Sequence, residues 1–258
     1  MEKLMEVLQA KLMPFANTLA SNKFLNALGQ TFQILLPIIM IGSFAALGAF
    51  LNIEFWQSFI ASTGLNMILM NTQSMTLSII AFYVVIVLPY QYAQKLNVNA
   101  ISAAVVSVMA FLILTPTQLY TAIPTQWLGY PGLFGAMFVG GLVPILIKFC
   151  IDRKIYIRMP EGVPQIVEDS FASIVPTFIT LVIATVLSVL FSKTSFGNFH
   201  AVIYNLIQTP LQGIGLSFPA YLFIQLLSTL LMFSGIHGNT VFGTITPLTM
   251  AASAENLA

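Results

Sequence analysis

The chain has 258 residues, of which 58% are hydrophobic and only 7% charged, and its formal net charge is +1. A soluble domain carries about 25% charged residues, so this composition excludes a soluble globular protein, and nine basic residues are too few for a nucleic-acid surface. The single cysteine, Cys150, excludes an intrachain disulfide and a metal site built from several cysteines. Several uncharged runs approach the roughly 20 apolar residues that a membrane-spanning helix needs. We therefore expect an all-α polytopic membrane protein.

The N-terminal segment is predicted to form an amphipathic helix. Apolar side chains recur at helical spacing from Met1 to Leu12, and charged side chains occupy the rest of the turn. Such a helix either lies in the membrane plane or docks on the rest of the protein as a solvated helix. Charged and polar residues continue to Lys23, and no small-residue cleavage pattern follows the first apolar run. We therefore expect no cleaved signal peptide.

About six membrane spans are predicted from the apolar runs. The first contains Pro37, which a helix in lipid tolerates as a kink, and the segment after it, with Glu54 and Trp56, is interpreted as a loop. The fourth holds closely spaced glycine and alanine residues, which we attribute to close helix packing. The spans are placed at residues 29–51, 74–91, 100–114, 132–150, 171–191 and 216–233.

A second in-plane helix is predicted at residues 196–215, between the fifth and sixth spans. His200, Tyr204 and Gln208 recur there at a spacing of four, opposite an apolar set that includes Phe199 and Leu206. This pattern is typical of an amphipathic helix. We interpret His200 as part of its polar face rather than as a ligand.

Basic residues predict the orientation of the chain. With six spans, eight of the nine fall on one side of the membrane and Lys193 alone on the other. The positive-inside rule then predicts a cytoplasmic N-terminus in a cell membrane. The eight are Lys3, Lys11, Lys23, Lys95, Lys148, Arg153, Lys154 and Arg158.

The stretch from Phe233 to Gly243 is the strongest candidate for a functional site. No acidic or basic residue occurs between Thr194 and Ala254, yet His237 lies inside this uncharged region. An ionisable group in an apolar span usually faces a cavity or a partner, although a histidine near a helix end is often only internally hydrogen-bonded. Gly235 and Gly238 allow a backbone to approach a ligand, and Asn239 adds hydrogen-bonding capacity. These residues fit a re-entrant loop.

Two motifs give the sequence a resemblance to a known family. Pro160, Glu161, Gly162, Val163 and Pro164, followed by Ser170-Phe171 and Val175-Pro176, resemble the cytoplasmic loop and following helix of enzyme IIC permeases of the sugar phosphotransferase system. The subgroup is the lactose, cellobiose and diacetylchitobiose family. The segment 235–238, Gly-Ile-His-Gly, falls where that family has its sugar-binding histidine. The order of the spans agrees over essentially the whole chain.

The resemblance implies a fold of two parts. Residues 1–192 would form an N-terminal membrane domain with the dimer contact, and residues 193–258 would begin a sugar-binding domain that contains the in-plane helix, the sixth span and the re-entrant loop. Because family members are considerably longer, the chain is expected to match the N-terminal part of a permease, as a split or truncated product or a separately made half. The remaining helices and a sugar-contacting glutamate are expected beyond Ala258.

The resemblance also implies a function. The permease would translocate a β-linked disaccharide such as cellobiose, lactose or diacetylchitobiose, and the phosphoryl-donating cysteine would lie on a separate enzyme IIB, supplied by enzyme IIA. His237 would contact the sugar, Gly235, Gly238 and Asn239 would shape the loop, and residues 160–164 would form a cytoplasmic hinge. For Glu161 we favour an ion pair with Arg153 or Arg158 in solvent over a chemical role. The resemblance also implies a homodimer, and it implies no nucleotide, metal or organic cofactor.

Two other functions are considered. The chain could be a membrane remnant or regulatory half-subunit that dimerises without transporting anything. An intramembrane enzyme built on His237 is disfavoured, because no carboxylate lies within a predicted span to assist it. The sequence does not identify the sugar.

Overall fold

The computed structural model describes residues 21–116, 123–160 and 162–209, together with Pro219, Leu222 and Leu226. Every regular element in these residues is helical. Four helical stretches are long and apolar enough to cross a membrane, and one shorter apolar helix accompanies them, so the predicted all-α membrane fold is confirmed. The four are Lys23–Phe50, Leu65–Leu96, Tyr130–Asp152 and Gln165–Ser192, and the shorter helix is Ala100–Leu114. The predicted N-terminal amphipathic helix and sixth span lie outside the described residues.

Helix α2 (Lys23–Phe50) is the first span. It begins six residues before the predicted start because Asn22 caps it: the Asn22 side-chain oxygen accepts hydrogen bonds from the N–H groups of Phe24 (3.0 Å) and Leu25 (3.1 Å). Such a cap satisfies backbone donors that have no partner in the first turn. Pro37 lies inside the helix, as predicted.

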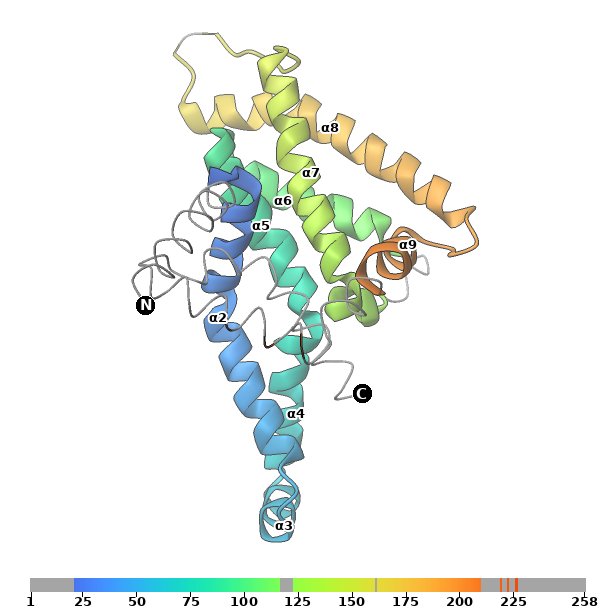
Figure 1. Cartoon of the computed structure of the whole chain (residues 1–258). Helices are drawn as coiled ribbons and strands as arrows, with labels where there is room; N and C mark the ends of the chain where they lie inside the picture. Colours follow the sequence, from blue (N-terminus) through green and yellow to red (C-terminus); the bar gives the residue numbers. More distant parts are fainter. Residues whose placement is uncertain are drawn as a thin grey trace, which may run out of the picture.

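The segment after α2 was predicted as a loop, and this prediction is wrong. Residues Glu54–Thr63 form α3 and Leu65–Ser74 form α4, joined at Gly64 in the left-handed region (φ 73°). The Trp56 indole N–H donates to the Gly48 carbonyl (2.6 Å), and the Gln57 amide donates to the Ala49 carbonyl (3.1 Å). These side chains satisfy carbonyls at the end of α2 that the helix itself leaves unpaired, and they hold α3 against it. In Figure 1, α3 lies at the far lower end of the molecule.

The second span combines α4, a 3₁₀ turn (Leu77–Ile79) and α5 (Ile80–Leu96). Helix α5 lies at the centre of the fold and packs against α2, α6 (Ala100–Leu114) and α7 (Leu133–Asp152). Its side chains at Ala81, Val84, Val85 and Leu88 are fully buried. The left-handed Asn97 (φ 56°) ends α5 and begins the short turn into α6.

Glycines of α7 allow this close packing. A Cβ added at Gly140 would lie 3.1 Å from the Leu88 side chain of α5, and one at Gly141 would lie 2.7 Å from the Phe24 ring of α2. The interpretation of these small residues as helix-packing positions is therefore confirmed for contacts within the chain. The same glycines consequently give no separate support to a dimer contact.

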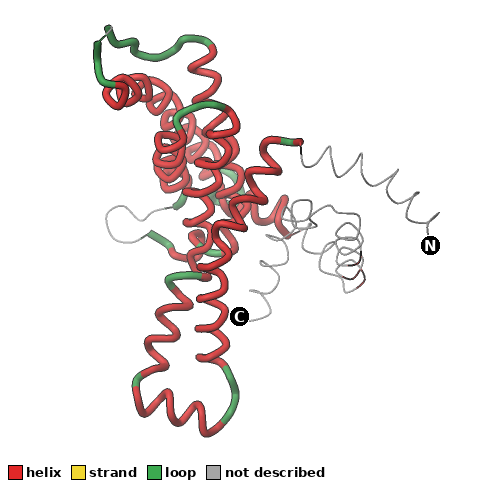
Figure 2. Tube along the Cα trace, turned by 90° about the vertical axis from the view of Figure 1, so that its left-hand side faces the viewer, coloured by secondary structure: helices red, strands yellow, loops and turns green. Residues whose placement is uncertain are grey.

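Helix α8 (Gln165–Ser192) is the predicted fifth span. Among the four long apolar stretches it has the smallest share of buried residues. Figure 1 shows it passing beside the top of α7 and then diverging toward α9 (Phe199–Ile203). A π-helical turn, Tyr204–Gln208, continues α9. Figure 2 shows a long loop at the end of the molecule opposite α3; this loop joins α7 to α8. The two ends of the bundle therefore differ: one carries the α3–α4 hairpin and the other the charged loop.

Candidate functional site

The predicted sugar-binding residues His237, Gly235, Gly238 and Asn239 lie outside the described residues. Their role stays a prediction. The described part of the chain contains instead the predicted hinge loop, two buried or half-buried polar contacts and an apolar crevice. These features determine what the N-terminal helices can contribute to a site.

The hinge motif immediately precedes α8. Gly162 adopts φ 97°, a conformation that favours glycine. Pro164 precedes the helix, and its carbonyl accepts hydrogen bonds from the N–H groups of Val167 (2.9 Å) and Glu168 (3.1 Å). Pro160 and Val163 belong to the same turn region, whereas Glu161 lies outside the described residues. The motif therefore reverses the chain after the charged loop and initiates the fifth span.

A polar contact links this helix start to the third span. The Asn99 amide donates to one carboxylate oxygen of Asp169 (3.2 Å), and the Gln165 amide donates to the other (2.8 Å). Asn99 also caps α6, because its side-chain oxygen accepts a hydrogen bond from the Ser102 N–H (2.9 Å). Sequence reasoning missed this contact because Asn99 and Asp169 are 70 residues apart. It attaches the hinge end of α8 to the beginning of α6.

His200 lies in the core, and its prediction as an exposed polar face is wrong. Its side chain is 1% exposed, whereas Leu206, assigned to the apolar face, is 60% exposed. His200 is buried because its ring packs among Phe111, Trp127 and Phe199. The π turn Tyr204–Gln208 changes the helical register only after Ile203, the part of the helix that contains the exposed Leu206. The polar partner that His200 requires comes from a distant part of the chain.

That partner is Thr115, the residue that follows α6. The His200 Nε2 atom lies 3.0 Å from Thr115 Oγ1, and the Thr115 hydroxyl donates its own proton to the Phe111 carbonyl (2.8 Å). A hydroxyl has one proton to donate. Thr115 must therefore accept a hydrogen bond from His200, which assigns the imidazole proton to Nε2.

Aromatic rings surround the imidazole. The Trp127 ring stacks on it at 5.4 Å with an interplanar angle of 19°, and the rings of Phe111 and Phe199 approach it edge-on. The Nδ1 atom has no hydrogen-bond partner in the described residues, and a Cβ at Gly135 would lie 2.6 Å from it. Burial lowers the pKa of His200 from 6.5 to about 4, against a smaller opposing effect of the Phe111 carbonyl. The imidazole is therefore neutral near pH 7, and it fastens α9 to α6 and α7.

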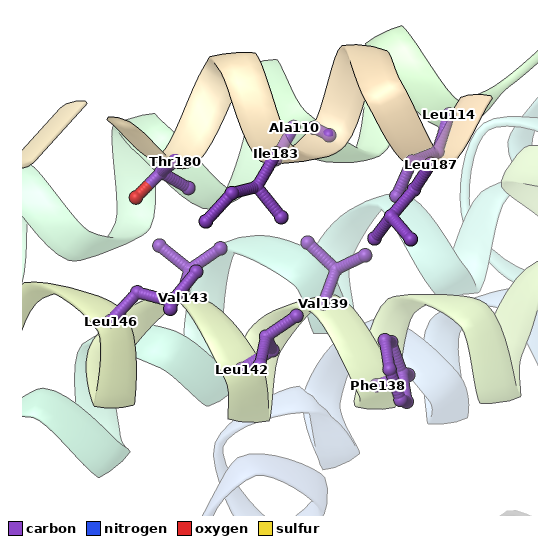
Figure 3. Close-up of a pocket in the computed structure, with 11 residues that line it drawn as sticks. Ala110, Leu114, Phe138, Val139, Leu142, Val143, Leu146, Thr180, Ile183 and Leu187 are labelled. Carbon is purple, nitrogen blue, oxygen red and sulfur yellow. The ribbon is translucent and has the colours of Figure 1, made fainter. Parts of the chain in front are cut away.

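An apolar crevice lies where α6, α7 and α8 meet. Figure 3 shows Phe138, Leu142 and Val143 of α7 opposite Ile183 and Leu187 of α8. The one polar residue in its lining, Thr180, donates its hydroxyl proton to the Pro176 carbonyl (2.8 Å). A sugar needs many hydrogen-bond partners, and unmade buried hydrogen bonds are costly. This crevice is therefore not suited to a sugar.

Comparison with known proteins identifies the family. The model of the family described as "Phosphotransferase system, EIIC" matches residues 29–257. The chain belongs to this EIIC family. The predicted membership of the enzyme IIC permeases is thereby confirmed.

Named relatives and a solved structure agree with the family match. This EIIC chain is 30% identical to the cellobiose-specific EIIC component of Geobacillus stearothermophilus and 29% identical to the lichenan permease IIC component of Bacillus subtilis (strain 168). Each alignment covers 99% of this chain and 60% of the relative. The crystal structure of the transporter ChbC, the IIC component of the N,N'-diacetylchitobiose-specific phosphotransferase system, matches with a TM-score of 0.84 at 30% identity. That match covers 94% of this chain and 60% of ChbC, so the EIIC chain spans about three-fifths of the length of these proteins.

Proposed function

We propose that this EIIC chain acts in a phosphoenolpyruvate-dependent phosphotransferase system as a sugar permease subunit that translocates a β-linked disaccharide. The observation that carries the proposal is the match to ChbC over 94% of the chain at a TM-score of 0.84. The relatives' names, cellobiose-specific EIIC component and lichenan permease IIC component, favour cellobiose or a related β-linked sugar over an unrelated solute. Lactose and diacetylchitobiose belong to the same set of candidate substrates.

The proposed sugar contact is His237, with Gly235, Gly238 and Asn239 shaping the loop around it. A neutral imidazole donates one hydrogen bond and accepts another, which suits a sugar hydroxyl. The lining of the α6–α7–α8 crevice supports this placement indirectly, because it offers no free hydrogen-bonding group. Residues 1–192 would then supply the scaffold and residues 193–258 the beginning of the sugar-binding domain.

The proposed partners follow from the same family. Enzyme IIB would phosphorylate the sugar at the cytoplasmic face, enzyme IIA would supply the phosphoryl group, and two copies of the permease would form a homodimer. The N-terminus and the α7–α8 loop would face the cytoplasm. The loop residues 160–164 would act as the hinge between the two domains, a role compatible with the position of the described residues among them, just before α8.

Sugar uptake by cells that express the chain tests this proposal. The chain is expressed alone and together with the C-terminal half of a family relative, in a host that supplies enzymes IIA and IIB. Uptake of radiolabelled cellobiose, lactose and diacetylchitobiose is measured. We expect uptake only from the combined halves, and its loss with His237→Ala. The control variant Thr185→Val removes an exposed hydroxyl on α8 that bonds only within its helix.

Two results would contradict the proposal. Unchanged uptake by the His237→Ala variant in the combined system would remove His237 from the sugar site. Failure of the combined halves to take up any of the three candidate sugars, with both halves present in the membrane, would argue against a permease function.

A further inference from the structure

Three cations cluster immediately after the α7 span. Arg153, Lys154 and Arg158, here called the cation patch, are exposed and follow the last residue of α7, Asp152. Asp152 is already paired, since it lies 2.6 Å from Lys148 on the same helix. In the described residues no carboxylate lies within ion-pair distance of any member of the cation patch. Among the described residues, the patch therefore presents three positive charges with no carboxylate paired to them at the end of a membrane span.

Backbone geometry holds the cation patch at the end of the helix. The Lys154 backbone is left-handed (φ 59°), and the Ile155 N–H donates to the Cys150 carbonyl (2.8 Å). This pattern is typical of a helix C-terminus at which the chain reverses. Cations in the last turn also stabilise a helix dipole, but that effect falls off within one turn. It can account for Arg153 and Lys154 but not for Arg158, which is six residues beyond α7.

Exposed apolar side chains alternate with these cations. Phe149 is 52% exposed, Ile155 and Ile157 are each 39% exposed, and the Arg153 guanidinium lies 5.6 Å from the centroid of the Phe149 ring. Arg158 lies at the same distance from the Tyr156 ring. Apolar groups beside cations at the end of a span are suited to the boundary where acyl chains meet headgroups.

We propose that the cation patch binds the phosphate headgroups of anionic phospholipids in the surrounding bilayer. Guanidinium groups bind phosphate oxygens through paired hydrogen bonds, and the neighbouring isoleucine and phenylalanine side chains contact the upper acyl chains. A basic segment beside a span gains attraction from each cation near an anionic membrane surface. A soluble protein partner would match the charges but would leave these apolar side chains at the membrane boundary unexplained.

Thermal-shift titrations with short-chain lipids test the site. The full chain, purified in a mild detergent, is titrated separately with dioctanoyl phosphatidylglycerol, dioctanoyl phosphatidylcholine and sodium phosphate. Phosphatidylglycerol is expected to raise the unfolding temperature at the lowest concentration. In the triple variant Arg153→Gln, Lys154→Gln and Arg158→Gln, we expect the midpoint concentration to rise roughly a hundredfold, because three cations are lost.

A matched control distinguishes the effect of losing the cation patch from the effect of lowering the net charge. The triple variant Lys23→Gln, Lys95→Gln and Lys193→Gln removes the same charge elsewhere and should bind phosphatidylglycerol as the unmodified chain does. The proposal would be overturned if both triple variants bound phosphatidylglycerol equally weakly. It would also be overturned if phosphatidylcholine or free phosphate raised the unfolding temperature of the unmodified chain as much as phosphatidylglycerol does. Normal phosphatidylglycerol binding by the patch variant would also overturn it. If that variant bound phosphatidylglycerol normally but lost sugar uptake when co-expressed with the C-terminal half, the surface would be assigned to a protein partner.

Discussion

His200 Nε2 and Thr115 Oγ1 lie 3.0 Å apart and join two segments that are 85 residues distant in the sequence. The contact is fully buried, because His200 is 1% and Thr115 2% exposed. It connects α9 to the end of α6, which has only 15 residues and is therefore about 22 Å long. This length is below the roughly 30 Å of the hydrocarbon core, and α9 with its buried histidine covers the C-terminal end of the helix.

Removing the Thr115 hydroxyl tests this contact. In the Thr115→Val variant the side-chain shape is nearly kept, but the buried His200 N–H loses its acceptor, which is expected to cost about 1–3 kcal/mol of unfolding free energy. The control Thr185→Val removes an exposed hydroxyl and should change stability little. Thermal or denaturant unfolding in detergent measures both. Equal stability of the two variants would show that the His200–Thr115 hydrogen bond contributes nothing.

The stability of the fold should fall in weak acid because of His200. Its pKa is about 4 in the folded chain and about 6.5 when unfolded, so the unfolded state binds more protons between these values. The stabilisation from the neutral imidazole is therefore full above pH 6.5 and declines as the pH falls toward 4. The decline is at most about 3 kcal/mol. The residues that contact the ring are uncharged: Phe111, Thr115, Trp127, Gly135 and Phe199.

The variant His200→Gln isolates this effect from other titrating groups. Its amide can still donate to Thr115 but does not titrate. The unfolding midpoint of the unmodified chain and of the variant is measured from pH 4 to pH 7.5. As the pH falls, the midpoint of the variant should rise relative to that of the unmodified chain. Parallel pH profiles would contradict the assignment of a neutral buried imidazole.

Gly135 is predicted to be intolerant of a side chain. A Cβ there would lie 2.6 Å from His200 Nδ1, so Gly135→Ala should displace the imidazole and destabilise the fold by about 1–3 kcal/mol. At Gly48 a Cβ would meet only the flexible end of Leu69 at 3.3 Å, and Gly48→Ala serves as the control. The double variant Gly135→Ala with His200→Ala should recover part of the loss. Additive losses in the double variant would argue against the contact.

The helices themselves were largely predictable from the sequence. Residues 100–114 were predicted as a span and form α6 with the same limits, because uncharged apolar runs between polar caps define such helices. The α3–α4 hairpin was missed, since its stability depends on Trp56 and Gln57 reaching back to carbonyls of α2. The hydropathy pattern of a sequence does not indicate such a side-chain cap.

Polar contacts between distant segments were not predictable. His200 was assigned to a polar face because it recurs with Tyr204 and Gln208 at a spacing of four, but the fold buries its ring against Thr115 and three aromatic rings that lie far from it in sequence or beside it in the helix. Asn99 and Asp169 each look like ordinary residues at a helix end until the fold brings them to 3.2 Å.

The orientation of the chain is the last prediction. The α3–α4 hairpin and the α7–α8 loop lie at opposite ends of the bundle (Figures 1 and 2). Residues 51–75 contain a single charged residue, Glu54, whereas the loop contains Arg153, Lys154 and Arg158. The positive-inside rule therefore predicts that the loop faces the cytoplasm. Single-cysteine variants on a Cys150→Ser background test this with an impermeant maleimide applied to intact cells. Ser62→Cys and Lys193→Cys should label at once, and Lys154→Cys only after permeabilisation; the opposite pattern would invert the topology.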